Sequence, residues 1–202
     1  MAEGPHKPII ALTIDDGFYP AGCRQEFEYL RSNHIAATFF PAWTGVVQDP
    51  GLWREIAKAG YPIGNHTLTH ANLAHRGLPA SVIRYQLREA QRRISALIHH
   101  PLLPVWRPPG GGYNELDLEI AGKLGLHTML LWSNTDADTA LHSKPSGMLR
   151  DALQGGDGAI LLTHCNRKVS VHLLPQIVQG YLARGFRFVT VPRLLRPYGL
   201  GG

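Results

Sequence analysis

The chain has 202 residues and a formal net charge of +5, with 44% hydrophobic and 17% charged residues. These values are typical of one globular domain with a substantial core. The positive charge favours an anionic partner, but no run of Lys and Arg stands out, so nucleic acid is not expected as that partner. No apolar run is long enough to cross a membrane, so no membrane-spanning segment is expected.

The first residues and the cysteines restrict the protein class further. Residues 1–4 do not resemble a signal peptide, which predicts either a cytosolic protein or a trimmed chain. The two cysteines, Cys23 and Cys165, form no Cys-x-x-Cys pair. Neither a redox motif nor a cysteine-rich zinc site is therefore expected, and we expect no disulfide between them.

Short apolar runs bounded by turn residues alternate with helical segments along the whole chain. Strands are predicted at residues 9–13, 35–40, 61–64, 103–106, 126–132, 159–163 and 186–191. Helices are predicted from Pro20 onward and at residues 52–59, 83–97, 116–124, 147–153 and 173–182. This alternation favours an α/β fold with parallel strands, either an open sheet or a barrel.

We find no internal repeat and no linker in the sequence. The predicted organisation is a short amino-terminal tail at residues 1–7, one domain at residues 8–196 and a carboxy-terminal tail at residues 197–202. A monomer is expected.

Two histidines, His66 and His70, are four residues apart and follow the apolar run at residues 61–63. If the chain turns helical there, both imidazoles project from one face, which suits a metal ion. No Glu stands between them, so this is not the His-Glu-x-x-His protease motif. The alternative is a pair of exposed histidines on a surface turn.

Polar side chains with catalytic potential follow the carboxyl ends of five predicted strands. They are Asp15 and Asp16, His66 and His70, Arg107, Asp136 and Asp138, and His164. In a parallel barrel these strand ends form one rim, where active sites lie, whereas an open sheet would separate the residues. We therefore predict a barrel, with seven strands rather than eight.

The residue types on this rim suit metal-assisted hydrolysis. Asp16, His66 and His70 supply three ligands, which leaves an open position for water, as in catalytic metal sites. Asp15 can act as a base that Arg107 keeps ionised by charge pairing. Residue His164 can act as general acid. Taken singly, the alternatives are a plain turn at residues 15–17, a rigid loop at residues 107–109, and a capping or buried histidine.

Four segments in order resemble the motifs of the polysaccharide deacetylases, carbohydrate esterase family four, with its NodB-type domain. They are Thr13-Ile14-Asp15-Asp16-Gly17, His66-Thr67-Leu68-Thr69-His70, Arg107-Pro108-Pro109-Gly110 and Leu162-Thr163-His164. The resemblance covers residues 8–192. It implies a distorted seven-stranded (β/α) barrel, similar to a TIM barrel.

The same resemblance implies a role for each motif residue. Asp16, His66 and His70 would hold Zn²⁺ or another divalent transition metal such as Co²⁺ or Ni²⁺. Asp15 would be the base and His164 the acid. The acetyl methyl group would lie against Leu162.

Two motifs depart from the family pattern. Gly110 stands where an aromatic residue is usual, although its backbone N–H can still meet an oxyanion, and Tyr113 is a candidate replacement for the ring. Aligning the fourth motif on Trp132-Ser133 puts Asp138 at the second Asp, Thr135 at the first, and Thr139 at the expected Trp. Asp138 is then the expected support of His164, with Asp136 as fallback. Trp132 and Trp43 are candidate substrate-binding residues.

The predicted function is removal of N-acetyl groups from N-acetylglucosamine-type glycans, peptidoglycan or chitin-like, with release of acetate. The alternatives are an O-acetyl xylan esterase, a lapsed member that only binds glycan, and a thiol hydrolase that uses Cys165 beside His164. The resemblance implies a secreted or cell-envelope protein, although a cytoplasmic one stays open.

Overall fold

The computed structural model describes residues 1–2, 4–75, 77–138 and 144–199, and its centre is a long buried strand. This strand, β1 (Ile9–Asp16), is buried along its whole length. It pairs with β2 (Ala37–Pro41) and with β6 (Ile160–His164), in parallel in both cases. Strands buried on both faces read as continuous apolar runs, which explains the sequence of β1.

Shorter parallel strands complete the barrel wall. β5 (Asn134–Thr135) pairs with β6, β7 (Arg187–Phe188) pairs with the start of β1, and β3 (Val105–Trp106) pairs with β4 (Thr128–Met129). Isolated bridges join Phe39 to Ile63 and Asn65 to Trp106, so the segment between them links β2 to β3. The result is the expected α/β architecture with a distorted barrel of parallel strands.

Two of the predicted strands differ from the strands of the structure. The predicted strand at residues 61–64 forms only the bridge at Ile63, and the second bridge belongs to the next residue, Asn65. The predicted strand at residues 126–132 is divided, because its start pairs with β3 whereas the residues after its end pair with β6. Between these pairings, the carbonyls of Leu130 and Leu131 accept hydrogen bonds from the Arg107 side chain. These two carbonyls are hydrogen-bonded to the buried Arg107 side chain and not to a neighbouring strand, which explains why the strand is interrupted here.

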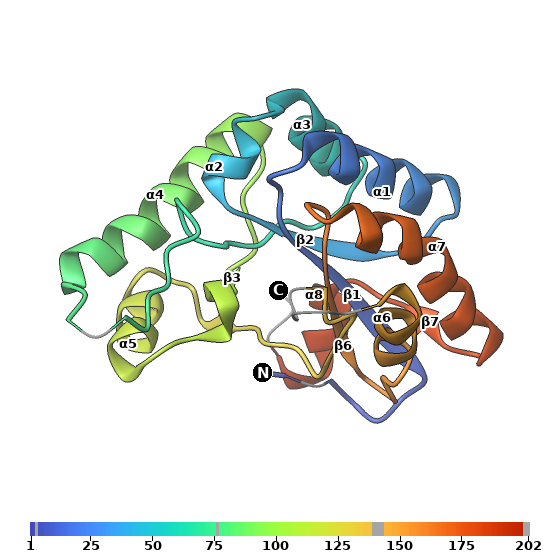
Figure 1. Cartoon of the computed structure of the whole chain (residues 1–202). Coiled ribbons are helices and arrows are strands. Elements are labelled where there is room, and N and C mark those ends of the chain that lie inside the picture. Colours follow the sequence, from blue (N-terminus) through green and yellow to red (C-terminus); the bar gives the residue numbers. More distant parts are fainter. Residues whose placement is uncertain (3, 76, 139–143, 200–202) are drawn as a thin grey trace.

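Helices lie around the outside of the strands (Figure 1). They are α1 (Pro20–Ser32), α2 (Trp43–Val46), α3 (Pro50–Lys58), α4 (Ala80–Ile98), α5 (Glu115–Lys123), α6 (Pro145–Ala152), α7 (Lys168–Ala183) and α8 (Val191–Leu195). Two 3₁₀ turns, η1 (Pro109–Gly111) and η2 (Arg196–Tyr198), are also present. Boundary residues start several helices: Asp49 caps α3, and Asn114 and Asp117 form a capping box on α5. No helix in the described part of the chain is long and apolar enough to span a bilayer.

The two cysteines form a disulfide, so the expectation that they stay unpaired was wrong. The Cys23–Cys165 bond joins α1 to the residue that follows β6. Helix α1 approaches this strand end closely at Gly22, where a Cβ would lie 2.4 Å from the carbonyl oxygen of Cys165. Because both cysteines are bonded, Cys165 is not a free thiol and the thiol-hydrolase alternative is withdrawn.

Residues before β1 also contact the barrel. The backbone N–H of Gly4 donates to the carbonyl of Gly158, and that of Leu131 donates to the carbonyl of Met1, both at 2.7 Å. The predicted amino-terminal tail therefore lies along the wall in these places.

Candidate active site

Asp16, His66 and His70 converge at the carboxyl end of β1. Oδ1 of Asp16 lies 3.2 Å from Nε2 of His66 and 3.0 Å from Nε2 of His70. One ligand atom from each residue falls within 4.8 Å of the others. His66 and Asp16 are buried, whereas the His70 side chain is about one-third exposed. The predicted ligand set is therefore brought together in space.

The backbone at this point is not the predicted helical turn. Residues 64–70 form no helix, and Thr67 and His70 have φ angles of 68° and 59°. Asp16, at the end of β1, has a φ of 77°. Such left-handed conformations cost free energy in residues other than glycine and gather at functional sites. Here they accompany the convergence of all three side chains on one point.

A second contact fixes the ring of His66. Its Nδ1 lies 2.8 Å from the carbonyl oxygen of Arg107, which can only accept a hydrogen bond. Nδ1 therefore carries a proton, and Nε2 is the ring nitrogen that faces Asp16. This is the usual way in which a second contact orients a histidine for metal binding.

The environment of Asp16 also fits a cation. Its Oδ1 is buried without a hydrogen-bond partner among the described residues, while Oδ2 accepts from Nδ2 of Asn166 at 3.0 Å. Burial alone would raise the pKa of Asp16, but the contacts with His66 and His70 outweigh it and hold that pKa well below the usual range. An orphaned carboxylate oxygen beside two imidazole nitrogens is a donor set that can hold a divalent metal.

Asp15 faces a different partner from its neighbour. Its Oδ1 accepts a hydrogen bond from Arg107 at 2.7 Å, and its Oδ2 lies 3.8 Å from Nε2 of His66. Arg107 is fully buried, donates to the Thr13 hydroxyl as well, and has its guanidinium carbon 4.6 Å from the Phe40 ring centroid. Burial lowers the pKa of Arg107 against the opposing charge of Asp15. The buried guanidinium therefore fixes the direction of the Asp15 carboxylate beside the candidate metal site.

His164, at the end of β6, is paired with Asp138. Its Nδ1 lies 2.8 Å from Oδ1 of Asp138, whose Oδ2 accepts from Ser170 at 3.3 Å. Burial lowers the pKa of His164, but contact with Asp138 and the charges of Asp15 and Asp16 more than offset this and raise it to about 9. Within the described chain no hydrogen bond involves Nε2, so the imidazolium can donate a proton from that atom.

One pocket of about 390 Å³ contains most of these groups. It is lined by Asp15, Asp16, Phe18, His66, His70, Gly110, Trp132, Leu162, His164, Asn166 and Arg167. Arg107 and Asp138 lie behind it, in contact with Asp15 and His164 respectively. The pocket thus combines a candidate metal site with a carboxylate and an imidazole on separate walls.

The predicted substrate-binding residues divide into two groups. Gly110, Leu162 and Trp132 line the pocket, whereas Trp43 and Tyr113 do not. Trp43 begins α2, and its ring centroid lies 5.9 Å from the guanidinium carbon of Arg93. Tyr113 is 43% exposed. Thr139, aligned with the family's Trp, lies outside the described residues.

Glycines explain the departure in the third motif. Gly110 has a φ of 65° and Gly111 a φ of 73°, a region that favours glycine. A Cβ at Gly111 would lie 2.8 Å from the ring of Trp132, whereas one at Gly110 would meet nothing within 4 Å. Trp132 therefore supplies an aromatic surface next to the glycines.

Sequence reasoning missed Asn166, Phe18 and Arg167. Nδ2 of Asn166 donates a hydrogen bond to Oδ2 of Asp16. The Phe18 ring lies edge-on to the His70 ring, with centroids 5.7 Å apart. Two of these residues follow His164 within three positions and one follows the Asp-Asp-Gly turn, so proximity to the motifs was the available signal.

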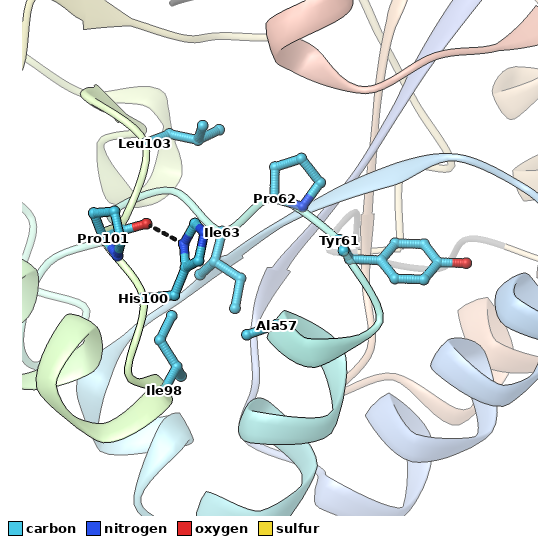
Figure 2. Close-up of a pocket in the computed structure, with 9 residues that line it drawn as sticks. Ala57, Tyr61, Pro62, Ile63, Ile98, His100, Pro101 and Leu103 are labelled. Atoms are coloured by element: carbon cyan, nitrogen blue, oxygen red, sulfur yellow. Dashed lines mark hydrogen bonds between the residues drawn. The ribbon is translucent and has the colours of Figure 1, made fainter.

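Another pocket lies between the carboxyl ends of α3 and α4 (Figure 2). It is lined by Ala57, Gly60, Tyr61, Pro62, Ile63, Ile98, His100, Pro101 and Leu103. Its one imidazole, His100, has Nδ1 2.8 Å from the carbonyl oxygen of Pro101, and no carboxylate is among the lining residues. This pocket holds no comparable set of catalytic groups.

Comparison with known sequences gives consistent results. The family model described as polysaccharide deacetylase matches residues 2–129. A peptidoglycan-N-acetylglucosamine deacetylase of Bacillus cereus is 31% identical over 195 residues, which cover 95% of this chain and 90% of that protein. A chitooligosaccharide deacetylase of Azorhizobium caulinodans is 26% identical, with 93% and 94% covered. Other peptidoglycan deacetylases are longer, and the chain spans 38–39% of their length.

Solved structures include both active and inactive relatives of this fold. A mutant of the CE4 family pseudoenzyme BA3943, with restored enzymatic activity, superposes with a TM-score of 0.87 at 25% identity, covering 96% of this chain and 70% of that one. Because such pseudoenzymes exist, the presence of the fold does not by itself show catalysis. The residues in the pocket have to carry that conclusion.

Proposed function

Because the chain belongs to the polysaccharide deacetylase family, we propose that it is a metal-dependent hydrolase that removes N-acetyl groups from N-acetylglucosamine-type glycans. The observation that carries this proposal is the pocket itself. The pocket is lined by Asp15, by the Asp16–His66–His70 set and by His164, with Arg107 behind Asp15 and Asp138 behind His164. These are the groups that hydrolysis of an amide requires.

Asp16, His66 and His70 would hold the metal, with zinc proposed and Co²⁺ or Ni²⁺ as alternatives, and the bound ion supplies Lewis acidity toward water and the acetyl carbonyl. Asp15 accepts the proton of the attacking water. Arg107 fixes the direction of that carboxylate through the 2.7 Å contact.

The remaining residues act on the acetyl group and the leaving amine. Leu162 and Trp132, which line the pocket, would provide the apolar surface for the methyl group, and the backbone N–H of Gly110 would meet the oxyanion. His164 gives the proton of Nε2 to the amine nitrogen as the C–N bond breaks. Water and an N-acetyl sugar thereby become acetate and a free amino sugar.

The pocket wall supports an anionic, peptidoglycan-like glycan as substrate. Arg167 lines the pocket and, among the described residues, forms no ion pair. The disulfide is typical of oxidising compartments, which supports a cell-envelope or secreted location. Chitin oligomers and acetylated xylan are the alternative substrates.

The test is acetate release from a panel of acetylated glycans, with metal-depleted and zinc-reloaded protein. We expect zinc-dependent release, strongest on peptidoglycan fragments. Asp15→Asn should abolish release and keep the metal, whereas Asp16→Asn should weaken metal binding. Equal metal loss in both variants would contradict the division of roles. Glycan binding without release in the zinc-loaded protein would instead identify a lapsed member.

A further inference from the structure

Asn166 lies in the turn between β6 and α7, outside the sequence motifs, and lines the candidate active-site pocket. Its Nδ2 donates a hydrogen bond to Oδ2 of Asp16 at 3.0 Å. Its own Oδ1 is buried and has no hydrogen-bond partner among the described residues. Within that part of the chain, the contact with Asp16 is therefore the hydrogen bond that orients the Asn166 amide.

The two carboxylate oxygens of Asp16 have different surroundings. Oδ1 lies 3.2 Å from Nε2 of His66 and 3.0 Å from Nε2 of His70, so it is the oxygen that faces the other candidate ligands. Oδ2 faces Asn166. A carboxylate can bind a metal ion through one oxygen or through both. While Oδ2 accepts from Asn166, Asp16 has one oxygen for the metal, which keeps a coordination position open for water.

The main chain of Asp16 is held on the opposite side, next to β2. Its carbonyl oxygen accepts a hydrogen bond from the backbone N–H of Ala42 at 3.1 Å. A Cβ at Gly45 would lie 2.5 Å from the same oxygen, so α2 packs closely against it. The remaining freedom of Asp16 is rotation of its carboxylate, and the last torsion of an aspartate has broad preferences. The direction of this carboxylate therefore depends on its contacts, and Asn166 holds the oxygen that points away from the histidines.

A covalent link holds Asn166 close to Asp16. The chain runs from Asp16 into α1, which carries Cys23. The disulfide leads from Cys23 to Cys165, the residue before Asn166. A Cβ at Gly22 would lie 2.4 Å from the carbonyl oxygen of Cys165, so α1 packs directly against this turn. The hydrogen bond from Asn166 to Asp16 thus closes a ring whose other links are covalent.

We propose that Asn166 is a positioning residue that keeps Oδ2 of Asp16 away from the metal, so that Asp16 binds through Oδ1 alone, and that the Cys23–Cys165 disulfide holds Asn166 in place for this role. The inference rests on the metal site of the proposed function but not on deacetylation itself. Removal of a hydrogen-bonded partner behind a metal ligand typically costs about 10- to 100-fold in metal affinity. Asn166 therefore affects both the affinity of the site and its open position.

Competition with a chromophoric chelator measures the zinc affinity without any substrate. Asn166→Leu keeps a side chain of similar shape but removes the donor, so we expect the zinc dissociation constant to rise about 10-fold or more. Asn166→Ala should give a similar loss. Asn33→Ala is the matched control, because the Asn33 amide donates to the carbonyl of Tyr29 at 2.8 Å, away from the pocket. A dissociation constant like that of the parent in both Asn166 variants overturns the proposal.

Crystal structures of the zinc-loaded parent and of Asn166→Leu test how Asp16 binds. In the parent we expect one carboxylate oxygen at about 2.0–2.2 Å from zinc and the other on Asn166. In the variant we expect Oδ2 to turn toward the zinc. A parent in which both oxygens bind zinc contradicts the role of Asn166. If the parent shows the expected contacts but releases no acetate from any glycan, the proposed function fails and the positioning role stands.

The part of the disulfide is tested by combining substitutions. Cys23→Ala with Cys165→Ala removes the link and leaves no thiol that could bind zinc. We expect weaker zinc binding than in the parent, with circular dichroism showing that the variant is folded. If the disulfide acts through Asn166, then Asn166→Leu in this background should bind zinc no more weakly than Asn166→Leu alone. Parent-like affinity without the disulfide, or two effects that multiply in full, overturns this part of the proposal.

Discussion

Two of the histidine–carboxylate contacts at the pocket, His66–Asp16 and His164–Asp138, use opposite nitrogens of the imidazole ring. His66 directs Nε2 toward Asp16 and donates from Nδ1 to a backbone carbonyl. His164 directs Nδ1 toward Asp138 and keeps Nε2 for the pocket. The choice of nitrogen separates a ring arranged as a ligand from a ring arranged as a proton donor.

The partner on the far side of each ring explains the difference. A carbonyl adds no charge, so it orients His66 and leaves the lone pair of Nε2 available. A carboxylate stabilises the imidazolium, so Asp138 favours the protonated form of His164. The same pair of residue types therefore yields two chemical roles, and each role can be removed separately.

The largest effect is expected from breaking the ligand side. His66→Ala removes one of three ligands, so we expect loss of bound zinc and a fall in kcat of at least about 10³-fold. Elemental analysis and acetate release measure both quantities. His75→Ala, at an exposed histidine of the same region, is the control and should leave both unchanged. Full zinc content in His66→Ala would refute the ligand assignment.

Arg107 contributes to both the base and the ligand side, and its removal should be the next largest effect. Arg107→Met leaves Asp15 buried without its cation, which should lower the free energy of unfolding by about 3–5 kcal/mol. The carbonyl that accepts from His66 belongs to the backbone and stays. Denaturant unfolding and zinc content are the measurements. We expect stability to fall more than zinc affinity, and the reverse order would show that the guanidinium mainly supports the ligands.

Changes to the His164–Asp138 pair should alter the pH dependence of activity. His164 has a folded-state pKa of about 9, above the ordinary value of about 6.5. The stabilisation from this charged pair is complete below about pH 6.5 and is lost as the pH rises through about 9. Activity should fall over the alkaline part of that range. Asp138→Asn should move the alkaline limb of kcat down by about one to two units and leave zinc bound.

Asp136→Asn is the matched comparison for that prediction. It removes a carboxylate that accepts from the backbone N–H of Asp138 but, among the described residues, forms no hydrogen bond with the imidazole, so it should move the limb less. A larger shift in Asp136→Asn than in Asp138→Asn would exchange the two roles.

The smallest effect is expected at the pocket mouth. Arg167→Gln should raise KM for an anionic glycan by up to about fivefold, since exposed charge contacts contribute about 1 kcal/mol or less. KM for a neutral chitin oligomer should not change. Lys168→Gln serves as control, because Lys168 is an exposed neighbour that does not line the pocket. Equal effects on both glycans would remove Arg167 from substrate selection.

The order of the elements was predictable because strong local patterns determine it. β1 reads as an apolar run that ends in Asp15 and Asp16, and α4 keeps its helical period. The sequence predicted a strand at residues 61–64, where the structure has only isolated bridges in and next to the segment. This difference was not predictable, because the pairing of the segment depends on two strands distant in sequence. The left-handed turns at Thr67 and His70 were hidden for the same reason, since tertiary contacts stabilise them.

The identities of the site residues were available from the motifs, whereas their support was not. Asn166 and Phe18 act through contacts between segments that only the fold brings together.

The Cys23–Cys165 disulfide also sets the order in which the protein can mature. The two cysteines are separated by 142 positions, and closing a loop of that length stabilises the folded state by roughly 5 kcal/mol in the chain-entropy view. Because Cys165 directly follows β6, the intramolecular bond can form only after β6 has been synthesised. With two cysteines, one chain has no scrambled isomer to form. The competing product of oxidation is a covalent link between two chains, so the yield of correctly bonded protein should fall as chain concentration rises during refolding.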